Sequence, residues 1–361
     1  MTTLLILVAS LLAAVLPTSL YVLIVWWFDR HEKEPLQLLA AAFLWGAVPA
    51  VLLAVGIELA SDAPVTAFSG SYGEIVGASV VAPVVEEAIK ASALVAIIVL
   101  VPGEFDGVLD GVIYGSIVGL GFAMTENVIY YVSAWGEGGV WSWSAIVMGR
   151  ALVFGFTHAM FTSLTGIGLG LARGHTQPGV RWLYAAGGLV AAILAHLFHN
   201  LFLAAGEFCI LSLLTDWLGL FLVVAIAVMA RRHEQQWIRA ELAEEVRLGV
   251  LTPDQYQNII TRRTTGPAPW RALARDAVEL AIKRHQYARL GGGRGNRWAD
   301  IVALRQRLVA RRRALGDAAV ERHRVCLTCG VLGDETEGAC CRSCGAPWTQ
   351  PTAREQRGEV G

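Results

Sequence analysis

The sequence predicts an all-α polytopic membrane protein with about seven transmembrane helices, followed by a C-terminal cytoplasmic helical region and a small zinc ribbon. Of its 361 residues, 55% are hydrophobic and 16% charged, and the mean hydropathy is +0.52. This is far too apolar for a water-soluble protein. The charge is also uneven, with 6 Lys+Arg and 15 Asp+Glu in residues 1–230 but 23 and 15 in residues 231–361. A single soluble enzyme and a fibrous or wholly disordered chain are therefore excluded.

Seven apolar stretches approach or exceed the ~20 residues that an α-helix needs to cross a bilayer. They lie at about 4–28, 36–60, 73–101, 108–133, 144–172, 181–206 and 209–230. The first is too long for the core of a secretory signal and lacks a basic leader and a small-residue cleavage site. We therefore expect it to remain as a helix.

Lys and Arg in the short connections predict the orientation, because basic loops stay on the cytoplasmic side of a membrane. They occur only after the first, fifth and seventh stretches, at Arg30, Lys33, Arg173, Arg181, Arg231 and Arg232. A multi-pass protein of the cell membrane follows, with its N-terminus outside and its C-terminus in the cytoplasm. Arg150 does not fit this pattern, since it lies about two turns inside the outer end of the fifth stretch.

The predicted domains are a transmembrane domain at 1–230, a basic helical region at 231–322, a zinc-ribbon-like domain at 323–348 and a disordered tail at 349–361. The basic region should contain helices at 231–248, from Thr252-Pro253, at 270–290 and at 297–322, with a linker at 264–269 and a hinge at 291–296. Gly249 should end the first helix, and Thr252 should cap the second with Pro253 at its first position. The run Arg311, Arg312 and Arg313 is interpreted as a solvated face, or alternatively as a contact with the anionic inner leaflet.

Five of the six cysteines lie between residues 326 and 344, where Cys326-x-x-Cys329 is followed after eleven residues by Cys341-x-x-Cys344. Two CxxC pairs suit tetrahedral thiolate coordination of Zn²⁺, and metal binding would supply folding energy to a segment with little apolar core. A redox pair or disulfides are the alternative, which a reducing cytoplasm disfavours. A site closed by four thiolates would be structural or would dock a cytoplasmic protein partner. Cys340 is interpreted as having no role in metal binding. The sequence contains no specific nucleic-acid motif.

Ionisable residues inside the predicted spans point to a functional site. Each costs at least ~2.5–3.5 kcal/mol near the bilayer centre, so each requires a reason. Glu86, Glu87 and Lys90 lie in the third span, with the lysine within reach of either carboxylate along one helix face. The other such residues are Glu126 in the fourth span, His158 in the fifth, and His196, His199 and Asn200 in the sixth.

The predicted orientation places these residues at similar depths. At about 1.5 Å per residue, they lie roughly 10 to 21 Å from the outer ends of their spans. Glu86, Glu126, His158, His196 and His199 would then form one layer between the middle and the outer third of the membrane. Neighbouring antiparallel helices would bring carboxylates, an ammonium and imidazoles together around a water-filled pocket.

At these residues the sequence resembles the PrsW family of intramembrane proteases and, more distantly, the CAAX-prenyl endopeptidase and Abi superfamily. The matching segments are DRHEKEP, EEAIK, GFAMTEN, FGFTH and HLFHN, over about residues 20–205. The basic residue of EEAIK is spaced as in PrsW, whereas the CAAX-type motif has Arg one position later, which argues against prenyl-protein processing. The resemblance implies a glutamate-type peptide hydrolase.

Hydrolysis of a peptide bond in a membrane requires a base for the water, a group that orients the water and donors for the developing oxyanion. We assign these roles to Glu86, to His158, and to His196 with Asn200, respectively. Glu87 and Lys90 would support them, and Glu126 and His199 would shape the pocket. An active-site metal held by Glu86, His158 and His196 is the alternative, although the chain has no HExxH motif, and metal-free catalysis is favoured.

The expected substrate is a membrane-bound protein, such as a single-span anti-sigma factor cut near its external side in a site-one-type event. The resemblance to PrsW suggests this substrate. A non-enzymatic transporter or membrane scaffold that uses the same Glu, His and Lys as an ion relay is the rival interpretation. A degenerate protease that only binds membrane proteins is a third.

Overall fold

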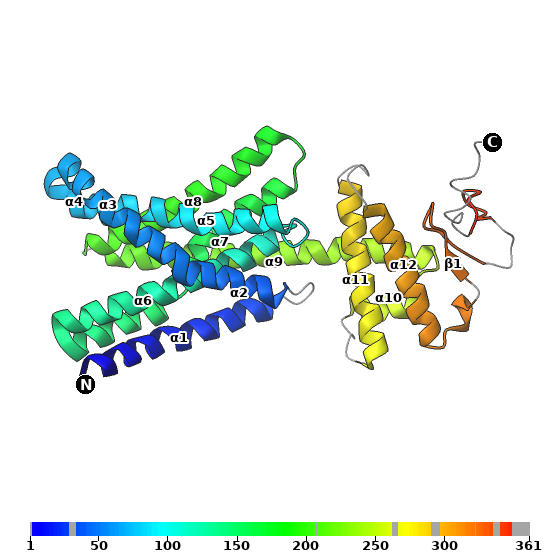
Figure 1. Cartoon of the computed structure of the whole chain (residues 1–361), viewed down its shortest axis with the longest axis horizontal. Coiled ribbons are helices and arrows are strands. Elements are labelled where there is room, and N and C mark those ends of the chain that lie inside the picture. The colour runs from blue at the N-terminus through cyan, green and yellow to red at the C-terminus, as the bar shows by residue number, and fades with distance from the viewer. Residues whose placement is uncertain are drawn as a thin grey trace, which may run out of the picture. The chain divides into compact units, whose positions relative to one another are not determined.

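The computed structural model describes residues 2–28, 34–206, 208–261, 266–289, 297–321, 323–334 and 340–348. The chain divides into two compact units, Met1–Arg231 and Arg232–Gly361. Helices dominate both units (Figure 1).

The first unit consists of helices connected by short turns. Its helices are α1 (Thr2–Phe28), α2 (Leu36–Trp45), α3 (Val51–Ser69), α4 (Gly73–Val76), α5 (Ala82–Leu100), α6 (Val108–Val147), α7 (Thr157–Arg173), α8 (Pro178–Ala204) and α9 (Cys209–Arg247), which continues into the second unit. Single π-helical turns at Gly46–Ala50, Gly77–Val81 and Met148–Val153 join consecutive helices.

In the part of the chain that the structure describes, five helical stretches are long and apolar enough to cross a membrane, so the chain is a multi-pass membrane protein. They are Thr3–Phe28, Leu36–Leu100, Val108–Arg173, Pro178–Ala204 and Cys209–Arg247. The predicted count of seven is not confirmed, because the predicted second and third spans form one stretch of 65 residues and the fourth and fifth form one of 66. Each long stretch contains a break, at Gly70, whose φ is 58°, and at Gly138 and Gly139, which are not helical. Figure 1 shows that the chain reverses direction between α3 and α5.

Helix α6 lies at the centre of the first unit, and glycines let its backbone touch its neighbours. A Cβ atom on Gly111 would stand 2.1 Å from the carbonyl oxygen of Gly166, and one on Gly119 would stand 2.2 Å from that of His158. Only glycine allows these contacts, which bring α6 and α7 together. Large apolar side chains such as Leu59, Trp182 and Leu218 are exposed, as expected of a lipid-facing surface.

The second unit contains the C-terminal part of α9, α10 (Pro253–Ile260), α11 (Ala268–Arg289), α12 (Arg297–Ala314), a 3₁₀ turn at Ala318–Val320 and the antiparallel strands β1 (His323–Val325) and β2 (Leu332–Asp334). Thr252 caps α10 as predicted, since its hydroxyl accepts a hydrogen bond from the backbone N–H of Gln255 at 3.1 Å. The hinge at 291–296, residues 264 and 265 of the linker and the tail at 349–361 lie outside the described residues.

Two predicted helix boundaries are wrong. The helix predicted at 231–248 does not begin there, because α9 runs without a break from Cys209 to Arg247. The helix predicted at 297–322 ends at Ala314, since Gly316 adopts a φ of 80° that stops it, and the chain then turns toward β1.

Of the arginine run of α12, Arg312 is buried, Arg311 is partly buried and Arg313 is exposed, so the predicted solvated face holds only in part. Arg311 donates to Asp276 at 2.6 Å, and Arg312 donates to Asp317 and to the carbonyl oxygens of Gly249 and Val250. Arg313 donates to the carbonyl oxygens of Val320 and His323. The run therefore connects segments of the second unit to one another.

Candidate active site and cysteine cluster

The candidate active site is built on α5, where Glu86, Glu87 and Lys90 are almost completely buried, at 5%, 0% and 0% exposure. The Lys90 ammonium donates to Glu86 Oε2 at 3.0 Å and to Glu87 Oε1 at 2.8 Å. It also lies 3.9 Å from the centre of the Phe122 ring on α6, a cation–π contact. One helix turn thus carries two carboxylates that share one cation.

His158 reaches the same ammonium from the second position of α7, where the close approach of Gly119 places its backbone. Its Nδ1 lies 3.1 Å from Lys90 Nζ, and its Nε2 lies 2.9 Å from Glu126 Oε2. An ammonium can only donate, so Nδ1 accepts, and Nε2 carries the proton that it donates to Glu126. Both ring nitrogens of His158 are therefore engaged with the protein.

His196 on α8 completes the cluster. Its Nδ1 lies 3.1 Å from Glu87 Oε1 and 4.0 Å from Glu86 Oε2, and the residue is 2% exposed. Thr162 on α7 donates to Glu87 Oε2 at 3.1 Å. Both oxygens of Glu87 are thus occupied, whereas Glu86 Oε1 forms no hydrogen bond to any described residue.

Glu126 extends the network to a residue that the sequence reasoning did not include. Arg150 donates to Glu126 Oε2 and, through Nε at 2.6 Å, to Asn127 Oδ1. Its guanidinium also stacks 3.9 Å from the centre of the Tyr130 ring. Arg150 was noted only as an exception to the loop-charge rule, although an arginine inside a span is itself a sign of function. Thr162, four residues after His158, was missed as well.

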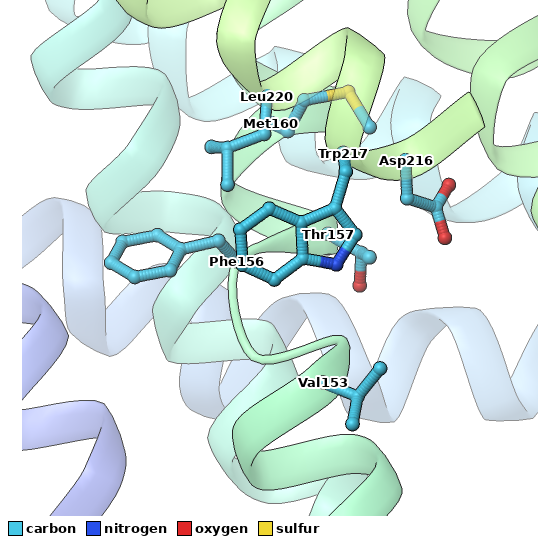
Figure 2. Close-up of a pocket in the computed structure, with 7 residues that line it drawn as sticks. All are labelled: Val153, Phe156, Thr157, Met160, Asp216, Trp217 and Leu220. Atoms are coloured by element: carbon cyan, nitrogen blue, oxygen red, sulfur yellow. The ribbon is translucent and has the colours of Figure 1, made fainter. Parts of the chain in front are cut away.

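Two predicted site residues have other partners. Asn200, which is half-buried, donates through Nδ2 to the carbonyl oxygen of Ala78 at 2.8 Å. His199 is paired through Nδ1 with Asp216 of α9 at 2.6 Å. Asp216 was also missed, and it lines a small cavity that Figure 2 shows beside Trp217. Neither residue bonds to the two carboxylates of α5.

One donor each from Glu86, Glu87, His158 and His196 lies within 4.8 Å of the others, and this set suits a divalent metal ion in type. Lys90 Nζ, however, is within 3.1 Å of three of these four residues. The three protons of the ammonium match those three acceptors, so a metal would have to displace Lys90. The residues do not fit a resident metal while Lys90 keeps this position.

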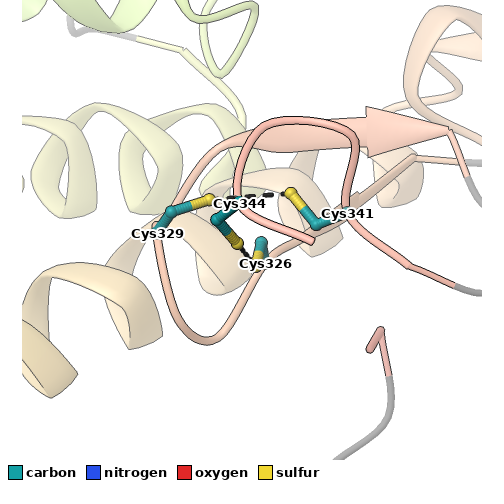
Figure 3. Close-up of side chains that lie close together, drawn as sticks. All are labelled: Cys326, Cys329, Cys341 and Cys344. Carbon is teal, nitrogen blue, oxygen red and sulfur yellow. Dashed lines mark hydrogen bonds between the residues drawn. The ribbon is translucent and has the colours of Figure 1, made fainter. Parts of the chain in front are cut away.

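The second candidate site is the cysteine cluster of the second unit (Figure 3). The Sγ atoms of Cys326 and Cys344 lie 3.7 Å apart, those of Cys329 and Cys341 lie 3.6 Å apart, and all four are within 4.8 Å of one another. A metal could bind here, and four thiolates are a donor set that Zn²⁺ favours. Cys340 is exposed and lies outside this set.

The two CxxC turns are built alike. The backbone N–H of Gly330 donates to the carbonyl oxygen of Cys326 at 2.8 Å, and that of Gly345 donates to Cys341 at 2.7 Å. Both glycines have a positive φ, of 70° and 75°, which a side chain would oppose. Burial raises the pKa of the Cys326 thiol, but hydrogen bonds from the backbone and from the neighbouring cysteines lower it to about 7, whereas burial raises the pKa of the Cys329 thiol to about 12.

Comparison with known proteins gives one match. A family model described as PrsW family intramembrane metalloprotease matches residues 34–231, which is more than half of the chain. No curated protein and no solved structure matches.

Proposed function

Because the chain belongs to the PrsW family of intramembrane proteases, we propose that it hydrolyses peptide bonds of membrane-embedded proteins with a water molecule activated by Glu86. The observation that carries this assignment is the difference between the two neighbouring carboxylates. Glu87 accepts hydrogen bonds from Lys90, His196 and Thr162, whereas Oε1 of Glu86 has no partner among the described residues. Glu86 is thus the carboxylate with an oxygen available to a water molecule.

In the proposed reaction, Glu86 takes a proton from water while the water oxygen bonds to the carbonyl carbon of the substrate. The carbonyl π-electrons move to its oxygen, which forms a tetrahedral oxyanion. When this intermediate collapses, the C–N bond breaks, and the leaving amine takes the proton from Glu86. Lys90 supplies a fixed positive charge close to the oxyanion, where exclusion of bulk water makes it effective.

The contacts of the histidines favour roles that differ from those assigned from the sequence. His158 is held between Lys90 and Glu126, so we assign it to positioning the ammonium rather than the water. His196 donates to Glu87 through Nδ1, and its Nε2, which has no partner among the described residues, is suited to hold the water. The amide of Asn200 donates to Ala78, which supports a role in packing α8 rather than at the oxyanion.

We further propose that the reaction is metal-free, with Lys90 as the cation of the site. The ammonium contacts three of the four residues that would bind a metal, which supports this choice. Structural Zn²⁺ would then bind only at the cysteine cluster, where no position is left open for a substrate.

The proposed topology has seven passes, with the two long stretches each turning back at the break near Gly70 or at Gly138 and Gly139. The distribution of Lys and Arg supports an external N-terminus and a cytoplasmic C-terminus. The proposed substrate is a single-span regulatory protein, such as an anti-sigma factor, cut near its external side. Family likeness supports this substrate.

The test is reconstitution of the full chain in lipid vesicles with a panel of single-span membrane proteins, followed by mass spectrometry of new peptide termini. The wild type should generate new termini. Glu86→Gln keeps the size of the side chain but removes the base, so cleavage should fall by about 100- to 10,000-fold.

Glu74→Gln is the matched control, because Glu74 is an exposed carboxylate on α4 and lies outside the cluster. It should cleave as fast as the wild type. The proposal is wrong if Glu86→Gln cleaves at the wild-type rate, or if the wild type produces no new termini across the panel.

A further inference from the structure

A second buried polar cluster lies in the membrane unit, outside the proposed reaction. Asp216, His199 and Ser212 are 5%, 5% and 0% exposed. His199 Nδ1 lies 2.6 Å from Asp216 Oδ2 and 3.0 Å from the hydroxyl of Ser212, which in turn lies 3.2 Å from Asp216. An aspartate inside a span is costly, and among the described residues His199 is its only ionisable partner.

The geometry excludes a serine nucleophile in this cluster. In a Ser-His-Asp triad the hydroxyl and the carboxylate contact opposite nitrogens of the imidazole. Here Ser212 and Asp216 both contact Nδ1 of His199. Asp216 can hold the ring of His199 in place, but Ser212 is not activated.

An aromatic contact connects His199 to the proposed active site. The Phe161 ring, which is completely buried, meets His199 edge-on with 5.7 Å between the ring centres. The same phenyl ring stacks on His196, with 4.7 Å between the centres and 14° between the planes. Phe154 meets His199 edge-on as well, at 5.2 Å, so His199 lies against two phenyl rings.

This contact leaves little freedom of movement. Protein interiors are close-packed, so a ring cannot turn without moving its neighbour. His199 is 5% exposed and lies against the Phe161 ring, which is completely buried. A rotation of His199 would therefore be passed to Phe161 rather than absorbed by empty space.

The geometry points to Asp216 as a positioning residue of the protease. Asp216 fixes His199, and His199 acts through Phe161. The Phe161 ring holds the ring of His196 in the plane that directs its Nε2 toward the water beside Glu86. This inference rests on the proposed function. It gives the last helix of the membrane unit a role in the reaction, although that helix contributes no residue to the carboxylate cluster. Misplacement of a reacting group by about 1 Å can cost about 100-fold in rate.

The test compares Asp216→Asn with Thr215→Val in the reconstituted full chain, with the single-span substrate that the wild type cleaves fastest. Asparagine keeps the size of Asp216 but removes its charge, so kcat should fall by about 10- to 100-fold while KM stays unchanged. Thr215 is the neighbouring exposed residue and bonds only to carbonyl oxygens of its own helix, so its replacement should change neither kinetic constant.

A second pair of variants tests the connection itself. If Asp216 acts through His199, Asp216→Asn should cause no further loss of kcat when it is added to His199→Phe. Phe161→Leu removes the aromatic contact but leaves the Asp216–His199 pair, and it should lower kcat to a similar extent, even if Asp216→Asn does not fold. Multiplicative losses in the double variant, or a Phe161→Leu variant with wild-type kcat, would overturn the inference.

Glu86→Gln, reconstituted and assayed in the same way, distinguishes the positioning role of Asp216 from the proposed function. If Glu86→Gln is inactive while Asp216→Asn is as active as Thr215→Val, the positioning role alone is wrong. If Glu86→Gln cleaves at the wild-type rate, the proposed function is wrong as well.

Discussion

The two units each bury a cluster of charges, and the clusters differ in how completely their members are paired. In the second unit, the fully buried Glu245 accepts from Arg305 Nε at 2.9 Å and from Arg305 Nη2 at 2.7 Å, and also from Arg284. Arg305 in addition donates to the carbonyl oxygen of Gly330 in the first CxxC turn. Both carboxylate oxygens of Glu245 are thus bound by guanidinium groups.

In the membrane unit the cations and acids are arranged differently. A single ammonium, Lys90, serves two carboxylates, and Oε1 of Glu86 and Nε2 of His196 have no hydrogen-bond partner among the described residues. Two imidazoles contact the cluster, whereas the Glu245 pairs contain none. Burial of charge alone therefore does not distinguish the two clusters, whereas the unused proton-accepting atoms of Glu86 and His196 do.

The largest effect that this comparison predicts is on stability. Glu245→Gln leaves the buried Arg305 without its anion, whereas Arg284 keeps its ion pair with Glu241, so the second unit should lose about 3–5 kcal/mol of stability. Pulse proteolysis of the full chain in denaturant, followed on cuts after residue 232, measures this loss. Cleavage of substrate in the absence of denaturant should stay unchanged. If Glu245→Gln lowered substrate cleavage as well as the stability of the second unit, the difference drawn here between the two charge clusters would be wrong.

A smaller effect is expected from Arg150→Gln. Without the guanidinium, Glu126 keeps only His158 as an ionisable partner, and the imidazole that holds Lys90 is less well oriented. We expect kcat to fall by about 10-fold with unchanged KM, because Glu126 and His158 stand between Arg150 and Lys90. Arg173→Gln is the matched control, since Arg173 donates to the carbonyl oxygens of Pro102 and Phe105, away from the cluster. A fall in kcat as large as that of Glu86→Gln would place Arg150 in the reaction itself.

The site could be predicted from the sequence where the cost of burial was decisive. Acids, a lysine and histidines inside apolar stretches demand partners, and their helices bring Glu86, Glu87, Lys90, His158 and His196 together. The cysteine cluster could be predicted as well, because it depends on local spacing: each CxxC turn presents two sulfurs to one point.

What could not be predicted were partners that depend on the rotation of each helix. His196 and His199 lie three residues apart on α8, yet one bonds to α5 and the other to α9. Spacing along a helix defines a face but not the neighbour that the face meets. The partners of Arg311 and Arg312 could not be predicted for the same reason, since Asp276 and the carbonyl of Gly249 are distant in sequence. The number of spans was not confirmed, because helical structure continues through the predicted connections between the second and third and between the fourth and fifth spans.

The most direct measurement is the zinc content of the purified full chain, determined together with its cleavage activity. We predict one zinc per wild-type chain, and none in the Cys326→Ser/Cys344→Ser variant, which should still cleave substrate in the presence of a chelator. A second zinc that remains in this variant and disappears with Glu86→Gln, together with loss of cleavage in the chelator, would contradict the account and show that a metal, not Lys90, is the cation of the active site.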